Sequence, residues 1–73
     1  MINQNDAIVI CSKVLAIEYE TNCIKVVSVE LDLENKRWLI TFKVWDWFNC
    51  VWYVWEGDNN KAYCKFLKEL SNK

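Results

Sequence analysis

The chain has 73 residues, of which 53% are hydrophobic and five are Trp, with one Gly and no Pro. This composition excludes a disordered or low-complexity chain, and the length predicts one domain, residues 1–73, with one core. Because the formal net charge is −1, the composition does not favour binding to nucleic acid or to an anionic membrane.

The first predicted element is a helix from Asp6 to about Thr21. Asn5 or Asp6 can cap its first amides, and the Asp6 carboxylate complements the helix dipole. Asn22 is a suitable residue at which to end it. A broad apolar face recurs at helical spacing and comprises Ala7, Ile8, Ile10, Cys11, Val14, Leu15 and Ile17. We therefore expect this helix to bury one face against the rest of the chain.

Two segments with alternating polarity follow, from Ile24 to Leu33 and from Trp38 to Trp45. A two-residue turn at Asn35-Lys36 would join them as an antiparallel hairpin. Its apolar side chains would then meet in pairs on one face: Leu33 with Trp38, Leu31 with Ile40, Val29 with Phe42 and Val27 with Val44. Since a slip of one residue would move every side chain to the other face, the pattern predicts this register.

A third strand is predicted from about Cys50 to Glu56, and it does not show the same alternation. Both of its alternate sets are apolar and aromatic: Trp47, Asn49, Val51, Tyr53 and Trp55 in one, and Phe48, Cys50, Trp52 and Val54 in the other. In an antiparallel sheet covered on one face, the reverse face should be polar. Some of these large side chains are therefore expected to point away from the first helix, beside Leu39 and Trp45.

The last predicted element is a helix from about Asn60 to Ser71, after a break at residues 57–60. Its apolar stripe would be Tyr63, Phe66, Leu67 and Leu70. Lys61, Lys65 and Lys68 would form its solvated face. The predicted fold class is α+β, a single small domain with the order helix, three-stranded antiparallel meander, helix.

The aromatic third strand carries the candidate binding surface. Contiguous exposed apolar patches mark binding sites, and Trp and Tyr are enriched at binding hot spots. The candidate partner-binding residues are Leu39, Trp45, Trp47, Trp52, Tyr53 and Trp55. Two alternatives stay open: the last helix could cover the reverse face, or the third strand could be a sheet edge that pairs with another chain.

Neither a metal site nor a cofactor is expected. The four cysteines, Cys11, Cys23, Cys50 and Cys64, form no CxxC pair, and there is no His. The first residues lack the features of a signal peptide, and no segment approaches the roughly 20 apolar residues that span a bilayer. We therefore expect a cytoplasmic protein with no membrane association, four buried thiols, and oligomerisation as the supplement that so small a core needs.

No catalytic residues are expected, so the chain is not predicted to be an enzyme. Without His, a Cys or Ser nucleophile lacks its usual base. The acidic residues Glu30, Asp32 and Glu34 are expected to keep the reverse face soluble. A single Gly cannot build a glycine-rich phosphate loop.

The order of the elements, and the segment Lys36-Arg37-Trp38-Leu39-Ile40-Thr41-Phe42-Lys43-Val44, resemble cystatin-like and NTF2-like small domains. The resemblance covers roughly residues 6–56, and the Gln-Val-Val-type loop of cystatins is absent. It implies a helix packed across a curved antiparallel meander, a fold often used for ligand binding, inhibition and dimerisation. It assigns no functional residues, because fold alone does not define function.

Taken together, these features predict a small protein-interaction or inhibitor module that forms a homodimer. Short, catalysis-free chains with aromatic surfaces suit phage or mobile-element proteins that block a host defence complex, so a host defence protein is the expected partner. Two alternatives come from other classes: a domain that holds a small molecule between helix and sheet, and a module that binds single-stranded nucleic acid. Nucleic acid is the less favoured partner.

Overall fold

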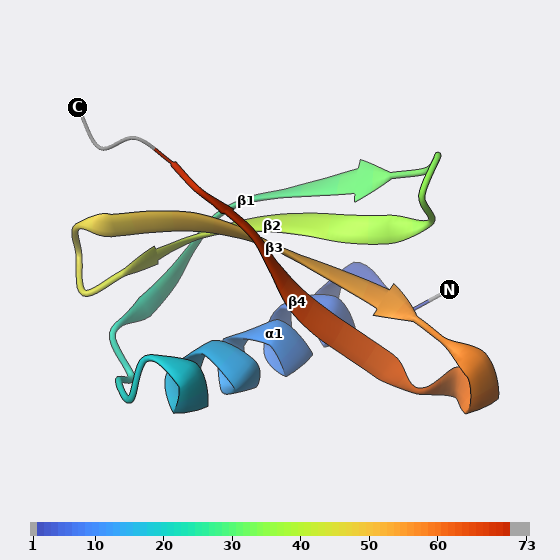
Figure 1. The fold of residues 1–73 in the computed structure, drawn as a ribbon, viewed down its shortest axis with the longest axis horizontal. Helices are drawn as coiled ribbons and strands as arrows, with labels where there is room; N and C mark the ends of the chain where they lie inside the picture. Colours follow the sequence, from blue (N-terminus) through green and yellow to red (C-terminus); the bar gives the residue numbers. More distant parts are fainter. Residues whose placement is uncertain (1, 71–73) are drawn as a thin grey trace.

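The computed structural model describes residues 2–70 and shows one helix against one face of a four-stranded antiparallel sheet. Figure 1 shows the helix lying across one side of the sheet, with no helix on the other side among these residues. The α+β class is therefore confirmed. The number of strands and the nature of the C-terminal element differ from the prediction.

Helix α1 spans Gln4–Glu18. Its N-cap is Asn3, whose Oδ1 accepts a hydrogen bond from the Asp6 amide at 2.8 Å, and this satisfies one of the unpaired amides of the first turn. Its C-cap is Tyr19, whose amide donates to the carbonyl oxygen of Leu15. The predicted first helix is thus confirmed, with both ends lying slightly closer to the N-terminus.

The core is the single apolar layer between α1 and the sheet. The helix contributes Ala7, Cys11 and Leu15, which recur every fourth residue and are fully buried. The sheet contributes six buried side chains from its two inner strands: Ile40, Phe42, Val44, Cys50, Trp52 and Val54. Each fully buried large side chain stabilises the fold by about 1.5–3 kcal/mol, so this layer is the main source of stability.

The four strands lie in the sheet in the order of the chain. They are β1 (Ile24–Asp32), β2 (Arg37–Val44), β3 (Phe48–Glu56) and β4 (Ala62–Glu69). Every neighbouring pair is antiparallel, so β1 and β4 form the two edges. The alternative in which the third strand is an edge is wrong, because β3 pairs with β2 on one side and β4 on the other.

The C-terminal segment is a strand, and the predicted last helix is wrong. A short 3-10 turn, Asp58–Asn60, occupies the predicted break, and β4 then pairs with β3. A β-bulge at Leu67 shifts the register of this pair and interrupts the two-residue alternation of β4. The apolar residues of this segment are therefore spaced like those of an amphipathic helix. The alternative in which a last helix covers the reverse face is therefore overturned. Ser71, the predicted end of that helix, lies outside the described residues.

The β1–β2 hairpin exists, but its register differs from the prediction by two residues. Leu31, rather than Leu33, is paired with Trp38, and a bulge at Val27 shifts the rest of the strand. The loop between β1 and β2, residues 33–36, is longer than the predicted two residues, and hydrogen bonds to the Asp32 carboxylate stabilise it. That carboxylate accepts hydrogen bonds from Asn35 Nδ2 and from Arg37 Nε, both at 2.9 Å.

Cys11 and Cys64 form a disulfide that joins α1 to β4. The expectation of four thiols is therefore wrong for these two residues, whereas Cys23 and Cys50 are free. Cys64 lies on the α1 side of β4 because its partner in the sheet is the buried Val54. The pairing depends on β4 being a strand, which explains why the sequence-based prediction did not include it.

Candidate association surface

The sheet face that points away from α1, called the open face below, is the candidate functional surface. Leu39, Thr41 and Lys43 line it on β2, and their cross-strand partners on β3 are Tyr53, Val51 and Asn49. By alternation Arg37 and Trp55 lie on the same face. Three of the predicted partner-binding residues, Leu39, Tyr53 and Trp55, are therefore brought together here. Leu39 and Tyr53 are direct cross-strand partners, so their side chains are neighbours on this face.

Three aromatic rings are stacked in a row on the open face, here called the aromatic ladder. Tyr53 and Trp55 have ring centroids 5.2 Å apart at an interplanar angle of 28°, and Trp55 and Tyr63 are 5.3 Å apart at 23°. The guanidinium of Arg37 lies 4.5 Å from the centroid of Tyr53, within cation–π range. The inner ring faces therefore contact one another, and the ladder presents mainly ring edges outward.

The ladder includes a residue that sequence reasoning missed. Tyr63, which is 44% exposed, was assigned to a helix stripe, whereas its cross-strand partner on β3 is Trp55. The alternation of Tyr63 and Lys65 would have placed both on one face if the segment had been taken as a strand.

A groove of about 390 Å³ lies beside the ladder on the open face. Leu39, Thr41 and Val51 come from the two inner strands, whereas Leu67, Lys68 and Leu70 come from β4 and the residue after it. Ser28 and Glu30 of β1 also line it. The surface is thus uneven, with a raised aromatic row and a hollow that is partly apolar.

The open face carries more positive than negative side chains, although the whole chain is slightly acidic. The register places Lys25, Arg37, Lys43, Lys65 and Lys68 on it, against Glu30 and Asp32. Arg37 Nε lies 2.9 Å from the Asp32 carboxylate. Hydrogen bonds from Asn35, and then from Arg37, hold the pKa of that carboxyl below its ordinary value. The three lysines that were expected on a helix lie on or just before β4.

Trp45 and Trp47 lie elsewhere, in the tight turn between β2 and β3. Trp45 was expected on the reverse face with Leu39, but its ring lies 5.4 Å from that of Tyr19 at the end of α1. Trp47 stacks on Trp45 at 5.8 Å and is 62% exposed. Lys25 Nζ lies 2.9 Å from Asp46 in this turn and lowers the pKa of its carboxyl. These two Trp residues form a second aromatic cluster, separate from the ladder.

Trp52 is not accessible at any surface. It is 6% exposed and belongs to the core under α1, where its ring packs edge-on against Tyr19 and Phe66. Of the six predicted partner-binding residues, three thus lie on the open face, two in the β2–β3 turn and one in the core. The alternation of polar and apolar residues could not assign the β3 residues to one face of the sheet, because both alternate sets of β3 are apolar.

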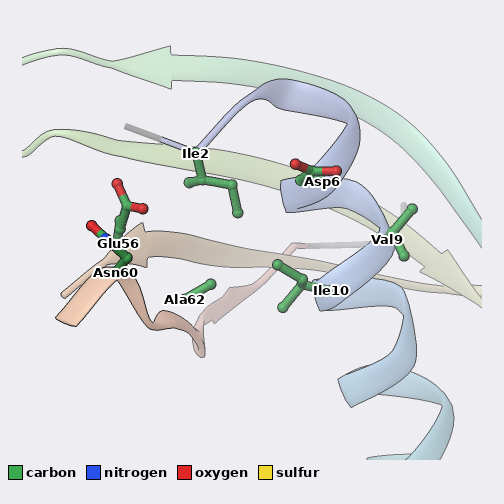
Figure 2. Close-up of a pocket in the computed structure, with 7 residues that line it drawn as sticks. All are labelled: Ile2, Asp6, Val9, Ile10, Glu56, Asn60 and Ala62. Carbon is green, nitrogen blue, oxygen red and sulfur yellow. The ribbon is translucent and has the colours of Figure 1, made fainter. Parts of the chain in front are cut away.

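A smaller pocket of about 280 Å³ lies at the N-terminal end of α1, and Figure 2 shows its lining. Residues from α1 lie on one side, and residues from the end of β3 and the start of β4 lie on the other. Trp38 Nε1 donates a hydrogen bond to the carbonyl oxygen of Ile2 at 2.8 Å and holds the segment before the helix. The lining residues are Ile2, Asp6, Val9, Ile10, Glu56, Asn60 and Ala62.

Residues 2–70 contain no cluster of three or more His, Cys, Asp or Glu side chains that could hold a metal ion. Within the same residues, α1 is neither long nor apolar enough to cross a membrane. The candidate features of residues 2–70 are the open face, the Trp45–Trp47 cluster and the pocket beside α1.

Comparisons with known proteins found no matching family model, no matching curated protein and no matching solved structure. The helix does lie across an antiparallel meander, as the resemblance to cystatin-like and NTF2-like domains implies. That likeness concerns the arrangement of elements and assigns no family.

Proposed function

We propose that this protein acts by binding another protein through its open face, as a small interaction or inhibitor module. The observation that carries the proposal is the aromatic ladder, Tyr53, Trp55 and Tyr63, on a sheet face that no element of residues 2–70 covers. Aromatic residues dominate the energetics of protein interfaces. A role in binding, without catalysis, fits a surface built from stacked rings and a groove.

The stacking geometry favours a protein partner over single-stranded nucleic acid. Proteins that bind single strands offer free ring faces on which bases stack. Here Trp55 lies between Tyr53 and Tyr63, and Arg37 lies over the ring of Tyr53. Ring edges and a partly apolar hollow suit the side chains of a protein better than the faces of bases.

The pocket beside α1 supports a second candidate function, the binding of a small molecule between helix and sheet. It is lined by both layers, which is the position that this alternative requires. Its volume of about 280 Å³ lies below the roughly 300–1,000 Å³ of most ligand pockets, so this candidate ranks second. Native mass spectrometry of the purified protein tests it, because a bound molecule would add a discrete mass.

The proposal includes a biological setting, a phage or mobile-element protein that blocks a host defence complex in the cytoplasm. The small size of the chain and its aromatic surface support that setting. The Cys11–Cys64 disulfide bears on the location, since cytosolic thiols are generally kept reduced. Alkylation of thiols in intact cells, followed by mass spectrometry, would show whether these two cysteines are linked where the protein works.

The test of the proposed function is capture of a partner by three tagged forms of the protein. The forms are the wild type, Tyr53→Glu on the open face, and Ile17→Glu on the outer side of α1, where Ile17 is 80% exposed. We expect the wild type and Ile17→Glu to retain the same partner and Tyr53→Glu to lose it. Retention of the same proteins by all three forms would overturn the proposal.

A further inference from the structure

One row of side chains crosses the open face with an ordered change of chemistry. Glu30 on β1 is paired with Leu39 on β2, Leu39 with Tyr53 on β3, and Tyr53 with Lys65 on β4. Acidic, aliphatic, aromatic and basic side chains thus follow one another from one edge of the sheet to the other. Glu30 and Lys65 are both exposed.

This order makes the row complementary to itself after a two-fold rotation. If a second copy faces the first with the axis along the strands, between β2 and β3, β1 of one copy lies over β4 of the other. Glu30 then faces Lys65 of the second copy, and Leu39 faces its Tyr53. Both contacts occur twice, as in any two-fold interface. Arg37, in the next row, faces the outward edge of Trp55 of the second copy.

A second aligned two-fold arrangement, with the axis across the strands, brings like charges together. It places β1 over β1 and reverses the order of the rows. Lys65 then faces Lys68 of the second copy, and Arg37 faces its Lys43, because these residues occupy mirrored rows on β4 and β2. Asp32 faces Lys25 of the second copy in the same rows, so like-charge contacts outnumber opposite-charge contacts by two to one. Charge complementarity therefore selects the axis along the strands, since opposed like charges suppress an alternative pairing.

We infer that the occupant of the open face is a second copy of this chain, packed face to face with Glu30 against Lys65 at both ends of the central row. This inference rests on the proposed function, because it uses the same surface. Sheets that pack in this way lie about 10 Å apart with their strands aligned within about 30°.

The size of the face limits the area that such a dimer can bury. Four strands at about 4.8 Å spacing and about eight residues of about 3.3 Å each cover roughly 500 Å² per copy. Burial of roughly 1,000 Å² in total lies at the lower end of specific interfaces. The dimer is therefore reversible and dissociates on dilution.

Sedimentation velocity over a range of concentrations tests the inference with two charge reversals, Glu30→Lys and Lys65→Glu. Each variant alone opposes like charges at both ends of the row, so its dimerisation constant should weaken at least tenfold. An equimolar mixture of the two variants has opposite charges at both ends, so it should form a heterodimer about as tightly as the wild type dimerises. Lys13→Glu on α1, an exposed site outside the open face, should change nothing.

Several outcomes would overturn the inference. The wild type could stay monomeric at all concentrations, or each variant could dimerise as tightly as the wild type. The equimolar mixture could also associate no more tightly than either variant does alone. The capture experiment separates this failure from failure of the proposed function. If the wild type stays monomeric while a different protein is captured and lost only with Tyr53→Glu, the open face remains a binding surface but its occupant is not a second copy.

Discussion

Trp52 and Tyr53 are adjacent in β3, yet their side chains lie on opposite faces of the sheet. Trp52 is in the core against α1, and Tyr53 is in the aromatic ladder on the open face. This parity separates a residue needed for folding from one available for association. It also turns a pair of neighbouring substitutions into a matched test.

Trp52→Glu should unfold the protein, whereas Tyr53→Glu should leave it folded. Removing a buried aromatic side chain costs about 3–5 kcal/mol, and a buried unpaired carboxylate adds a further penalty. The destabilisation caused by Trp52→Glu therefore exceeds the free energy of unfolding of so small a domain. Near-ultraviolet circular dichroism and denaturant unfolding measure the difference. Loss of structure in both variants would show that the open face is part of the core.

Reduction of the Cys11–Cys64 disulfide should lower the free energy of unfolding by roughly 4 kcal/mol. The bond closes a loop with a sequence separation of 53, and chain-entropy estimates for a loop of this length give about that value. Guanidinium unfolding with and without reductant measures the change, and Cys11→Ala should reproduce it. Cys23→Ser, at a free cysteine, is the matched control and should have little effect on stability.

Alkaline pH should destabilise the fold partly through Tyr19. Burial, and then the charge of nearby Cys50, raise the pKa of Tyr19 from 10.0 to about 12. Below pH 10 the Tyr19 hydroxyl is protonated in both the folded and the unfolded state, so the stability linked to its raised pKa is fully present. Between about pH 10 and 12 only the unfolded state releases this proton, and stability falls as the pH rises. Tyr19→Phe should lose stability less steeply in this window, as measured by thermal unfolding at a series of pH values.

The β1–β2 turn should tolerate glycine better than lysine at position 36. Lys36 has a φ of 52°, in the left-handed region that costs side chains with a Cβ about 1 kcal/mol. Lys36→Gly should therefore raise the free energy of unfolding by about 0.5–1 kcal/mol, which urea unfolding can resolve. Lys61→Gly, at a φ of −83°, relieves no such strain and should be slightly destabilising.

The first helix and the β1–β2 hairpin could be predicted because each has one apolar face and one polar face. Ala7, Cys11 and Leu15 repeat at helical spacing and are the residues that α1 buries. The hairpin register was missed by two residues, since side-chain hydrogen bonds from the turn to Asp32 and the bulge at Val27 changed the pairing. Such local contacts and bulges leave little trace in the pattern of polarity.

The last strand could not be predicted because a bulge changes its periodicity. Cys64 and Phe66 face α1, whereas Tyr63 and Lys65 face the other way, until Leu67 interrupts the alternation. Without β3 beside it, the segment has the apolar spacing of an amphipathic helix. Pairing with β3 supplies the backbone hydrogen bonds of a whole strand, and this long-range gain outweighs the local preference.

By itself, the sequence determined that a helix packs on a meander and that the third strand has too many aromatic residues for one buried face. Only the tertiary structure decided which of these residues are accessible. When both alternate sets of side chains in a strand are apolar, the sequence does not indicate which set faces the core. The β2–β3 turn put Trp52 under α1 and Tyr53 on the open face. Pairing with β4 then added Tyr63 to the ladder and brought Cys64 to Cys11. These are contacts between residues far apart in the chain, and only the complete sheet can bring them together.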